Sequence, residues 1–518
     1  MVSLDILPGP TDSGRPAGHF LMLICDVSQE QAGHARCPPF LPRQRASKIC
    51  VAKVPMQSLP LLIYRNYKNR DRDRGEMRKG HHMKMEDMIL VSVDDHFVEP
   101  PTIFDNHTPA KFKGRFPQMI KTEEGADAWK IEDRIIRSFG LNAVVGRRPE
   151  ELGMEPTALD QLRKGCYDVH ARVDDMDVNG ILGSLNFPSF VGMAGQNLEQ
   201  MADKELATAI VRAWNDWHID EWCGAYPERF IPCCIVPTWN PFEAAEEIRR
   251  CVAKGCHAVS FPPNPTLTGL PSLHSEYWHP LWKACAENNV VICLHISDAS
   301  AAAPSEDTPI DAYITNMQVS LYVTASDLTY SHILRQFPDI RFALSEGSIG
   351  WVPHCMERMD MVRQQHGAWT RQDFGGKLPS EVFKEHVYTC FISDRTGIKL
   401  RHDIGIDNIT YESDYPHADC LWPHAPEQLW KELGMIPEEE INKITHLNAM
   451  RQYSWNPFDK IKREDATVGA LRARAKAKGV DVSYMAGKGG EPPSVDLGPV
   501  RMKDVREQLA FSRKKEAV

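Results

Sequence analysis

From Met88 onward, short apolar runs alternate with longer amphipathic segments. Eight runs are almost continuously apolar, as expected of parallel strands buried on both faces; they cover residues 89–95, 180–188, 230–237, 256–263, 290–297, 340–347, 386–393 and 408–416. Between them, helical patterns start at Leu206, Pro241, His279 and Val352. This alternation predicts an α/β fold, a (β/α)8 TIM barrel with long insertions. A doubly wound open sheet is the alternative, but its glycine-rich phosphate fingerprint follows none of the strands.

The two ends of the chain have a different composition. Residues 1–87 are rich in proline and arginine and lack apolar periodicity, which predicts a disordered N-terminal extension. A translation start at Met83, Met85 or Met88 remains open. The barrel is predicted over residues 88–460. Residues 461–518 are first basic and then rich in glycine and proline, which predicts a helical tail that packs on the barrel or on a partner subunit.

The composition is that of a soluble globular protein. Of 518 residues, 42% are hydrophobic and 25% charged, and the net charge of −10 makes nucleic acid an unexpected partner. The N-terminal apolar run 19–27 is too short to cross a membrane and lacks the features of a secretory signal, so a cytoplasmic protein without a membrane partner is expected. The 14 cysteines include no CxxC pair, which favours buried reduced thiols over disulfides or a structural zinc site.

Potential metal ligands stand at the carboxyl ends of four predicted strands. The first strand ends on Asp94 and His96, the fifth on His295, the sixth on Glu346 and the eighth on Asp414. Each residue alone has a common structural explanation, such as a hydrogen-bonded histidine or an aspartate that caps a turn. Together they predict a divalent metal site, because a barrel of this type builds its active site from these strand ends.

Five motifs resemble the amidohydrolase-related family, in the branch of aminocarboxymuconate semialdehyde decarboxylase and the hydroxybenzoate decarboxylases. They are VSVDDHFVEP, LHIS, LSEGSIGW, YESDYPHAD and THLNAMRQY, which lie within residues 88–456. The resemblance implies a TIM barrel with a divalent metal, often zinc or manganese, at the strand mouth. It also implies that Asp94 and His96 replace the family's HxH or ExH pair, with His295 and Asp414 as further ligands.

The sequence departs from the family pattern in two places. Glu346 stands where most members of the branch carry a histidine, and no lysine ends the fourth strand. The missing lysine favours a single metal ion. A third carboxylate favours manganese or iron over zinc, although Glu346 as a bridging ligand would allow a dinuclear centre.

The leading functional hypothesis is a metal-dependent decarboxylase of a small aromatic or conjugated carboxylic acid. Asp414 would protonate the carbon that loses CO₂, and Glu346 would orient or relay that proton. A metal-dependent hydrolase of an amide, ester or lactone, with water activated by the metal, is the first alternative. A non-catalytic barrel subunit that partners a catalytic homologue is the second, and an iron enzyme that activates oxygen is a minor third.

Four further residues are predicted to face the mouth of the barrel and to contact a planar substrate, namely Glu99, Trp351, His417 and Trp422. For each of them a purely structural role is an equally good interpretation. The family resemblance also implies a homo-oligomer, most simply a dimer.

Overall fold

The computed structural model describes residues 83–137, 140, 142–153, 155–296, 304–485 and 498–505, and the described fold belongs to the unit His81–Val518. Most of the predicted N-terminal extension, up to residue 82, lies outside the described residues. That part of the domain prediction therefore stays a prediction.

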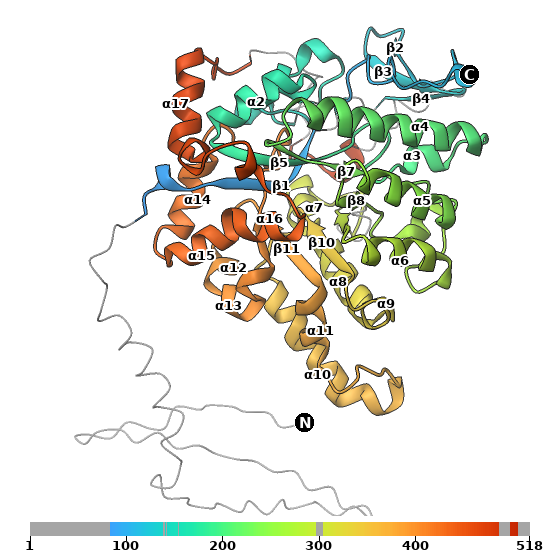
Figure 1. Cartoon of the computed structure of the whole chain (residues 1–518), viewed down its shortest axis with the longest axis vertical. Coiled ribbons are helices and arrows are strands. Elements are labelled where there is room, and N and C mark those ends of the chain that lie inside the picture. Colours follow the sequence, from blue (N-terminus) through green and yellow to red (C-terminus); the bar gives the residue numbers. More distant parts are fainter. Residues whose placement is uncertain are drawn as a thin grey trace, which may run out of the picture. The chain divides into compact units, whose positions relative to one another are not determined.

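All eight predicted strands are present, and they form one parallel sheet (Figure 1). The third predicted strand is divided by Pro232, which has no backbone N–H to donate. Its two pieces, β6 and β7, end the pairing order β6-β5-β1-β12-β11-β10-β9-β8-β7. Since these pieces are neighbours in the chain, the sheet closes into a barrel. The strands are β1 Leu90–His96, β5 Ile181–Phe187, β6 Phe230–Ile231, β7 Cys233–Cys234, β8 Ala258–Ser260, β9 Val291–His295, β10 Arg341–Ser345, β11 Val387–Phe391 and β12 Ile409–Tyr411.

The four predicted helices also form, and local signals explain where they begin. The side chain of Asp203 accepts a hydrogen bond from Leu206 N at the start of α4, and Asn240 caps α5 in the same way. Predicted as one helix from Leu206, the first segment is α-helical only to Asp216 and continues as a π-helix. The elements are α4 Lys204–Asp216, η6 Trp217–Cys223, α5 Pro241–Val252, α6 His279–Glu287 and α10 Val352–Thr370.

Further helices complete the layer around the barrel, as Figure 1 shows. They are α2 Val169–Val178, α3 Gln196–Glu199, α7 Ile310–Asn316, α8 Val319–Tyr330, α9 Ile333–Gln336, α11 Pro379–His386, α12 Arg395–Lys399, α13 Arg401–Ile404, α14 Ala425–Leu433, α15 Glu438–Asn442, the π-helical η10 Lys443–Leu447, α16 Asn448–Gln452 and α17 Val468–Lys478.

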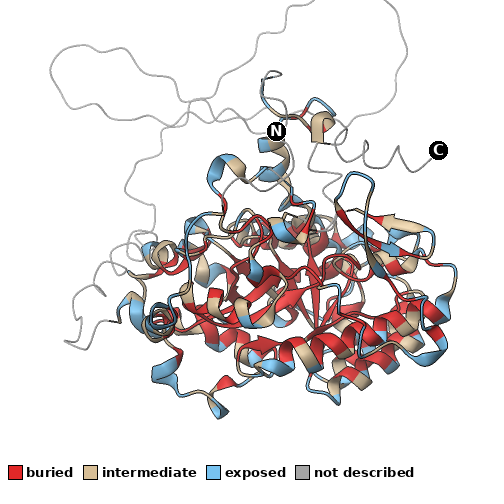
Figure 2. Cartoon of the chain, turned by 90° about the horizontal axis from the view of Figure 1, so that it is seen from above, coloured by how far each residue is buried: buried red, intermediate tan, exposed pale blue. Residues whose placement is uncertain are grey.

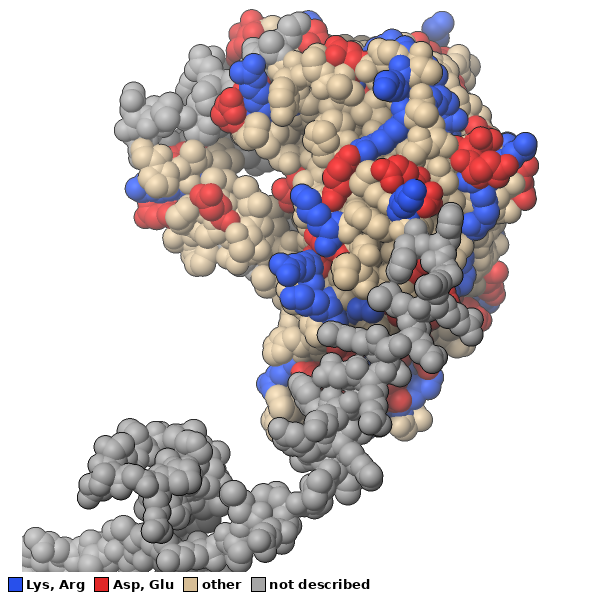
Figure 3. Space-filling view, turned by 90° about the vertical axis from the view of Figure 1, so that its left-hand side faces the viewer, with Lys and Arg blue, Asp and Glu red and all other residues tan. Residues whose placement is uncertain are grey.

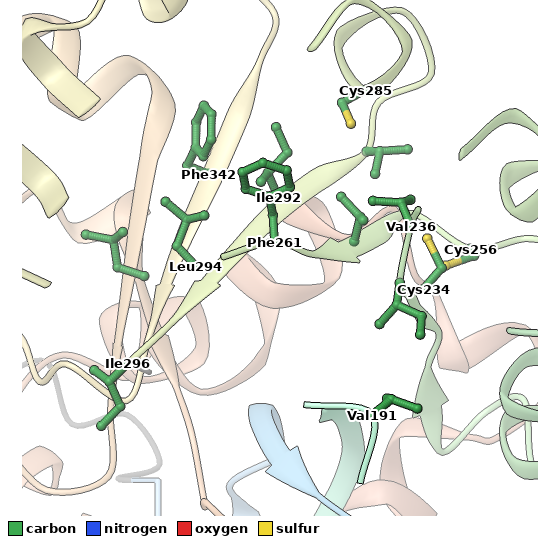
Figure 4. Close-up of a cluster of buried hydrophobic side chains, with 14 of the residues drawn as sticks. Val191, Cys234, Val236, Cys256, Phe261, Cys285, Ile292, Leu294, Ile296 and Phe342 are labelled. Atoms are coloured by element: carbon green, nitrogen blue, oxygen red, sulfur yellow. The ribbon is translucent and has the colours of Figure 1, made fainter. Parts of the chain in front are cut away.

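The barrel strands are buried almost throughout (Figure 2). Figure 4 shows Phe261, Ile292, Leu294 and Phe342 in one part of this core, where strands meet the helical layer. Each fully buried side chain of this size contributes roughly 1.5–3 kcal/mol. The near-continuous apolar runs of the sequence thus correspond to strands covered on both faces.

Two segments that flank or interrupt the barrel also have defined structure. The insertion after β1 contains an unpredicted three-stranded antiparallel sheet, β2 Gln118–Lys121, β3 Asp127–Ile131 and β4 Arg134–Ile136. In the tail, α17 packs on α2, where Arg474 bonds the Asp177 carboxylate at 2.6 Å, and its buried Leu471 joins the core cluster that includes Val91 and Leu182. Farther along, Met502 N donates to Thr308 O (2.9 Å), so the described part of the tail also contacts the loop before α7.

The surface and the thiols agree with the composition. Acidic and basic side chains are interspersed on the face drawn in Figure 3. The cysteines of the described segments are free, and all but the half-buried Cys420 are buried. Within those same segments, we find no helix with the length and apolar character needed to span a bilayer.

Acid is expected to destabilise the fold through His218. The ring stacks on Trp214 (5.1 Å between centroids), and Nε2 accepts a hydrogen bond from Cys233 N (3.3 Å). Burial lowers the pKa of His218 from 6.5 to about 3. Between pH 6.5 and about pH 3 the unfolded chain therefore binds a proton at this histidine that the folded chain does not bind. The contribution of the neutral His218 to folding stability is full above pH 6.5 and decreases as the pH falls below that value.

At pH 5.5 the expected loss from this one group is about 1–2 kcal/mol. The variant His218→Phe keeps the ring and removes the titration, so its free energy of unfolding should differ less between pH 7.5 and 5.5 than that of wild type. Urea denaturation at the two pH values measures the difference. As a control, Phe97→Leu changes the packing on the same ring without removing a titrating group, so it should lower stability equally at the two pH values. An unaltered pH dependence in His218→Phe would contradict the assignment.

Candidate active site

The predicted ligands meet at the carboxyl ends of the barrel strands. Asp94 and His96 lie at the end of β1, and His295 is the last residue of β9. Glu346 directly follows β10, whose Ser345 pairs in register with His295. Asp414 lies three residues after β12, and its backbone N donates to Asp94 O (2.8 Å). Parallel strand pairing therefore brings the five side chains to one end of the barrel, in two overlapping groups that share His96.

The nitrogen and oxygen atoms of these residues converge at short range. His96 Nε2 lies 3.3 Å from Asp94 Oδ1, 3.4 Å from Asp414 Oδ1 and 3.2 Å from His295 Nε2. His295 Nε2 lies 3.6 Å from Asp94 Oδ2 and 3.1 Å from Glu346 Oε2. Two donors bound to one ion at about 2.1 Å stand roughly 3 to 4 Å apart. The separations therefore fit a shared divalent cation.

The hydrogen-bonding state of the carboxylates fits a cation as well. Asp94 and Asp414 are fully buried, and none of their side-chain oxygens receives a well-directed hydrogen bond from the described residues. A buried carboxylate without a donor or a cation is costly. Burial, followed by the nearby Glu412, raises the pKa of Asp94 well above its ordinary value. A divalent ion would offset both the desolvation and the mutual repulsion of these groups.

The two histidines present the nitrogen atoms that a metal requires. His295 Nδ1 donates to Ile296 O (2.5 Å), which leaves the lone pair of Nε2 directed at the cluster. Burial and the neighbouring His417 and His295 hold the pKa of His96 well below its ordinary value. His96 is thus neutral near pH 7, the form that binds metal.

His417, which the sequence predicts to contact a substrate, also belongs to this cluster. Its ring stacks on His96 with 3.9 Å between centroids, and Nδ1 lies 2.9 Å from Asp414 Oδ1. Although burial opposes protonation, the Asp414 carboxylate raises the pKa of His417 to about 9. The pair can therefore hold a proton beside the candidate metal site.

Glu412 is a buried carboxylate in the motif YESDYPHAD, and no functional role was predicted for it. It receives hydrogen bonds from Glu346 N (3.0 Å) and Cys390 Sγ (2.6 Å), and burial raises its pKa to about 8. Glu412 and Asp414 are two residues apart, the same spacing that pointed to Asp94 and His96. Applied to the eighth strand, that spacing would have found it.

Backbone strain coincides with two of the candidate ligands. Asp414 has φ 55° and Glu346 has φ 64°, the left-handed region that side chains other than glycine rarely occupy. Such conformations persist where surrounding contacts hold them, and they concentrate at functional sites. Here the neighbouring strands hold both turns, through Asp94 O for Asp414 and through Glu412 for Glu346.

The remaining predicted pocket residues make framework contacts. Glu99 accepts hydrogen bonds from the backbone N of Ser189 and of Phe190, both at 3.0 Å. Trp422 donates to Asp175 O (3.1 Å). These contacts support the structural interpretation for Glu99 and Trp422.

The surroundings of Trp351 are compatible with a structural role and with a substrate contact. It is partly buried at the start of α10, where Nε1 donates to Gly347 O (2.7 Å) and its ring lies 5.6 Å from that of Tyr322. It follows the strand that leads to Glu346, so a contact with substrate stays a prediction.

Comparison with known proteins places this chain in a family. The sequence model of the amidohydrolase family matches residues 158–455. The curated gamma-resorcylate decarboxylase of Rhodococcus jostii is 24% identical over 323 residues, which span 57% of this chain and 90% of that protein.

Two solved structures show the same fold. An amidohydrolase from Mycobacterium avium subsp. paratuberculosis superimposes with a TM-score of 0.56 at 23% identity, over 70% of this chain and 99% of the other. The 5-carboxyvanillate decarboxylase of Novosphingobium aromaticivorans was solved as a complex with manganese and a nitrobenzoic acid. It superimposes with a TM-score of 0.50 at 17% identity, over 73% of this chain and 100% of the other. These likenesses support the barrel.

Proposed function

Because this chain belongs to the amidohydrolase family of metal-dependent enzymes, we propose that it is a carboxy-lyase of a small aromatic or conjugated carboxylic acid. The observation that carries the proposal is the convergence of potential metal ligands at the mouth of the barrel, namely Asp94, His96, His295 and Asp414. The buried carboxylate oxygens of Asp94 and Asp414 receive no well-directed hydrogen bond from the described residues. The relation to an aromatic-acid decarboxylase over 90% of that relative's length favours decarboxylation.

Asp94, His96, His295 and Asp414 would hold one divalent ion, with Glu346 beside it. When bound, such an ion supplies Lewis-acid stabilisation for the carboxylate of a substrate and for a neighbouring oxygen. A donor set rich in carboxylates favours manganese or iron over zinc. Manganese in the carboxyvanillate decarboxylase supports this choice.

Side chains of the protein would supply the proton that the reaction consumes. Decarboxylation breaks the bond between the ring carbon and CO₂ and leaves an electron pair on that carbon, which must take up a proton. Asp414 would hold this proton, and His417 at 2.9 Å would replenish it. Glu346, whose side chain is 15% exposed, is the carboxylate that could pass a proton toward solvent.

Hydrolysis of an amide, ester or lactone is the second candidate, and the additional carboxylate Glu346 favours it. Asp414 would then act as a general base that takes a proton from the attacking water. A role for Glu346 as a bridge between two ions would fit this reaction better than decarboxylation. Homodimerisation and a cytoplasmic location stay predictions.

Metal content tests the proposal first. Protein purified without chelator or affinity-tag metal should contain about one equivalent of manganese, iron or zinc by elemental analysis, because the two groups of potential donors overlap at His96. The groups are Asp94, His96 and His295, and His96, Glu346, Asp414 and His417. The occupancy should fall in His295→Ala and in Asp414→Ala, and the metal-loaded wild type should release CO₂ from hydroxybenzoic acids.

Other results would redirect the assignment. Two equivalents in wild type that fall to one in Glu346→Gln would favour hydrolysis. A folded wild-type protein that binds no metal would overturn the catalytic proposal and leave the non-catalytic barrel subunit.

A further inference from the structure

Asp95 is a buried carboxylate between two candidate ligands in the sequence, yet its hydrogen bonds run to other groups. The side chain is 2% exposed. Oδ1 accepts hydrogen bonds from Ser92 Oγ and Tyr415 N, both at 3.0 Å, and Oδ2 accepts one from Ser184 Oγ. Asp95 is therefore bound to the framework that carries the ligands.

That framework is a junction between the end of β1 and the segment after β12. We call residues Ser92–His96 and Ser413–Tyr415 the ligand junction. Four hydrogen bonds link its two halves: Ser413 N to Ser92 Oγ (2.8 Å), Asp414 N to Asp94 O (2.8 Å), Tyr415 N to Asp95 Oδ1 (3.0 Å) and His96 N to Tyr415 O (2.6 Å). Asp95 supplies one of these acceptors and also binds the hydroxyl of Ser92, which supplies another.

Regular strand pairing does not hold this segment by itself. The register of β1 with β12 is Ser92 opposite Tyr411, and the ladder of β1 with β5 shifts between Ser92 and Asp95. Beyond Tyr411 the chain turns through the positive φ of Asp414. The hydrogen bond from Tyr415 N to Asp95 fixes the residue that follows this turn, so it constrains the direction of the Asp414 carboxylate.

We propose that Asp95 is a positioning residue that sets the separation of the Asp94 and Asp414 carboxylates, and thereby the affinity of the site for a divalent cation. This inference rests on the metal site of the proposed function. The proposed site comprises side chains that would touch the ion, and Asp95 is an additional residue that would act without touching it.

Manganese binding tests the inference without an assay of activity. Chelator-treated protein is titrated with Mn²⁺, and the free ion is measured by electron paramagnetic resonance. Asp95→Ala should weaken binding about 10- to 100-fold, the usual effect of losing a group that orients ligands. Asp95→Asn should restore most of the affinity, because its amide oxygen can still accept the hydrogen bond from Tyr415 N.

A second buried carboxylate provides the matched control. Glu247 in α5 is 1% exposed and binds Arg250 and Asn215, away from the site. Glu247→Ala should reduce folding stability but leave the manganese affinity of the folded protein unchanged. If Asp95→Ala does not fold, Ser92→Ala removes the next bond of the junction and should weaken binding several-fold.

The outcomes separate the two proposals. Wild-type protein that binds none of Mn²⁺, Fe²⁺ and Zn²⁺ would overturn the proposed metal site itself. Tight binding by wild type and equally tight binding by Asp95→Ala, or by Ser92→Ala in its place, would overturn the positioning role alone. Equal losses in Asp95→Ala and Asp95→Asn would also contradict the role assigned to the Asp95 oxygen.

Discussion

Replacing Asp414 with asparagine is expected to lower the rate of decarboxylation by about 1,000-fold, since a positioned proton donor typically contributes 100- to 10,000-fold. The amide would keep the size of the side chain but could not carry the proton. It would also lose the charge that raises the pKa of His417. CO₂ release from the best hydroxybenzoic acid, measured in excess manganese, gives the rate.

Excess manganese distinguishes the loss of the proton donor from the loss of a ligand. If Asp414 only binds the ion, saturating metal should restore most of the rate, whereas the loss of the proton donor persists. Asp360→Asn is the matched control, because this carboxylate on α10 binds Ser380 and lies outside the site. A rate in Asp414→Asn near that of the control would refute the assigned role.

Replacing Arg172 with alanine should lower the free energy of unfolding by about 3–5 kcal/mol, because the change removes a buried cation that stabilises the buried Asp95 carboxylate and leaves buried carbonyl groups without a donor. Arg172 is 1% exposed; Nε donates to Gly165 O (2.7 Å), and Nη2 donates to His96 O. Its guanidinium also lies 4.2 Å from the centre of the Tyr415 ring. Alanine would leave two buried carbonyls unpaired and a cavity beneath the site.

Urea denaturation in the presence of chelator measures this effect apart from metal binding. Arg172→Lys should lose less stability than the alanine variant, because an ammonium can replace one of the two hydrogen bonds. Arg451, whose side chain is 51% exposed, serves as the surface control, and its alanine variant should change stability by less than about 0.5 kcal/mol. A change below about 1 kcal/mol in Arg172→Ala would show that the network is dispensable for folding.

The eight strands and four helices could be predicted because their signals are local. Apolar runs and caps such as Asp203 act within a few residues, and strand alternation places Asp94 and His96 on one face. The rule that barrel enzymes use the carboxyl ends of strands then led to His295, Glu346 and Asp414. The resemblance to a known family supported the same residues.

Other features could not be predicted in this way. The short antiparallel strands β2 to β4 lie in an insertion whose apolar pattern is weak. For Glu99 and Trp422 the sequence left a substrate contact and a structural role open, because their hydrogen-bond partners Ser189 and Asp175 come from distant segments. Position relative to a strand does not determine which partner a side chain meets.

The sequence by itself thus determined the barrel and the candidate donor residues, because periodicity and residue type are properties of short segments. Only the tertiary structure decided which carboxylates converge at the candidate metal site and which hold the framework. Asp94 and Asp95 are adjacent and chemically identical. Among the described residues no hydrogen-bond donor is directed at the Asp94 side chain, whereas Asp95 accepts a hydrogen bond from Tyr415 N, 320 residues away. Their roles differ because strand pairing, and not local sequence, places the partners of each side chain.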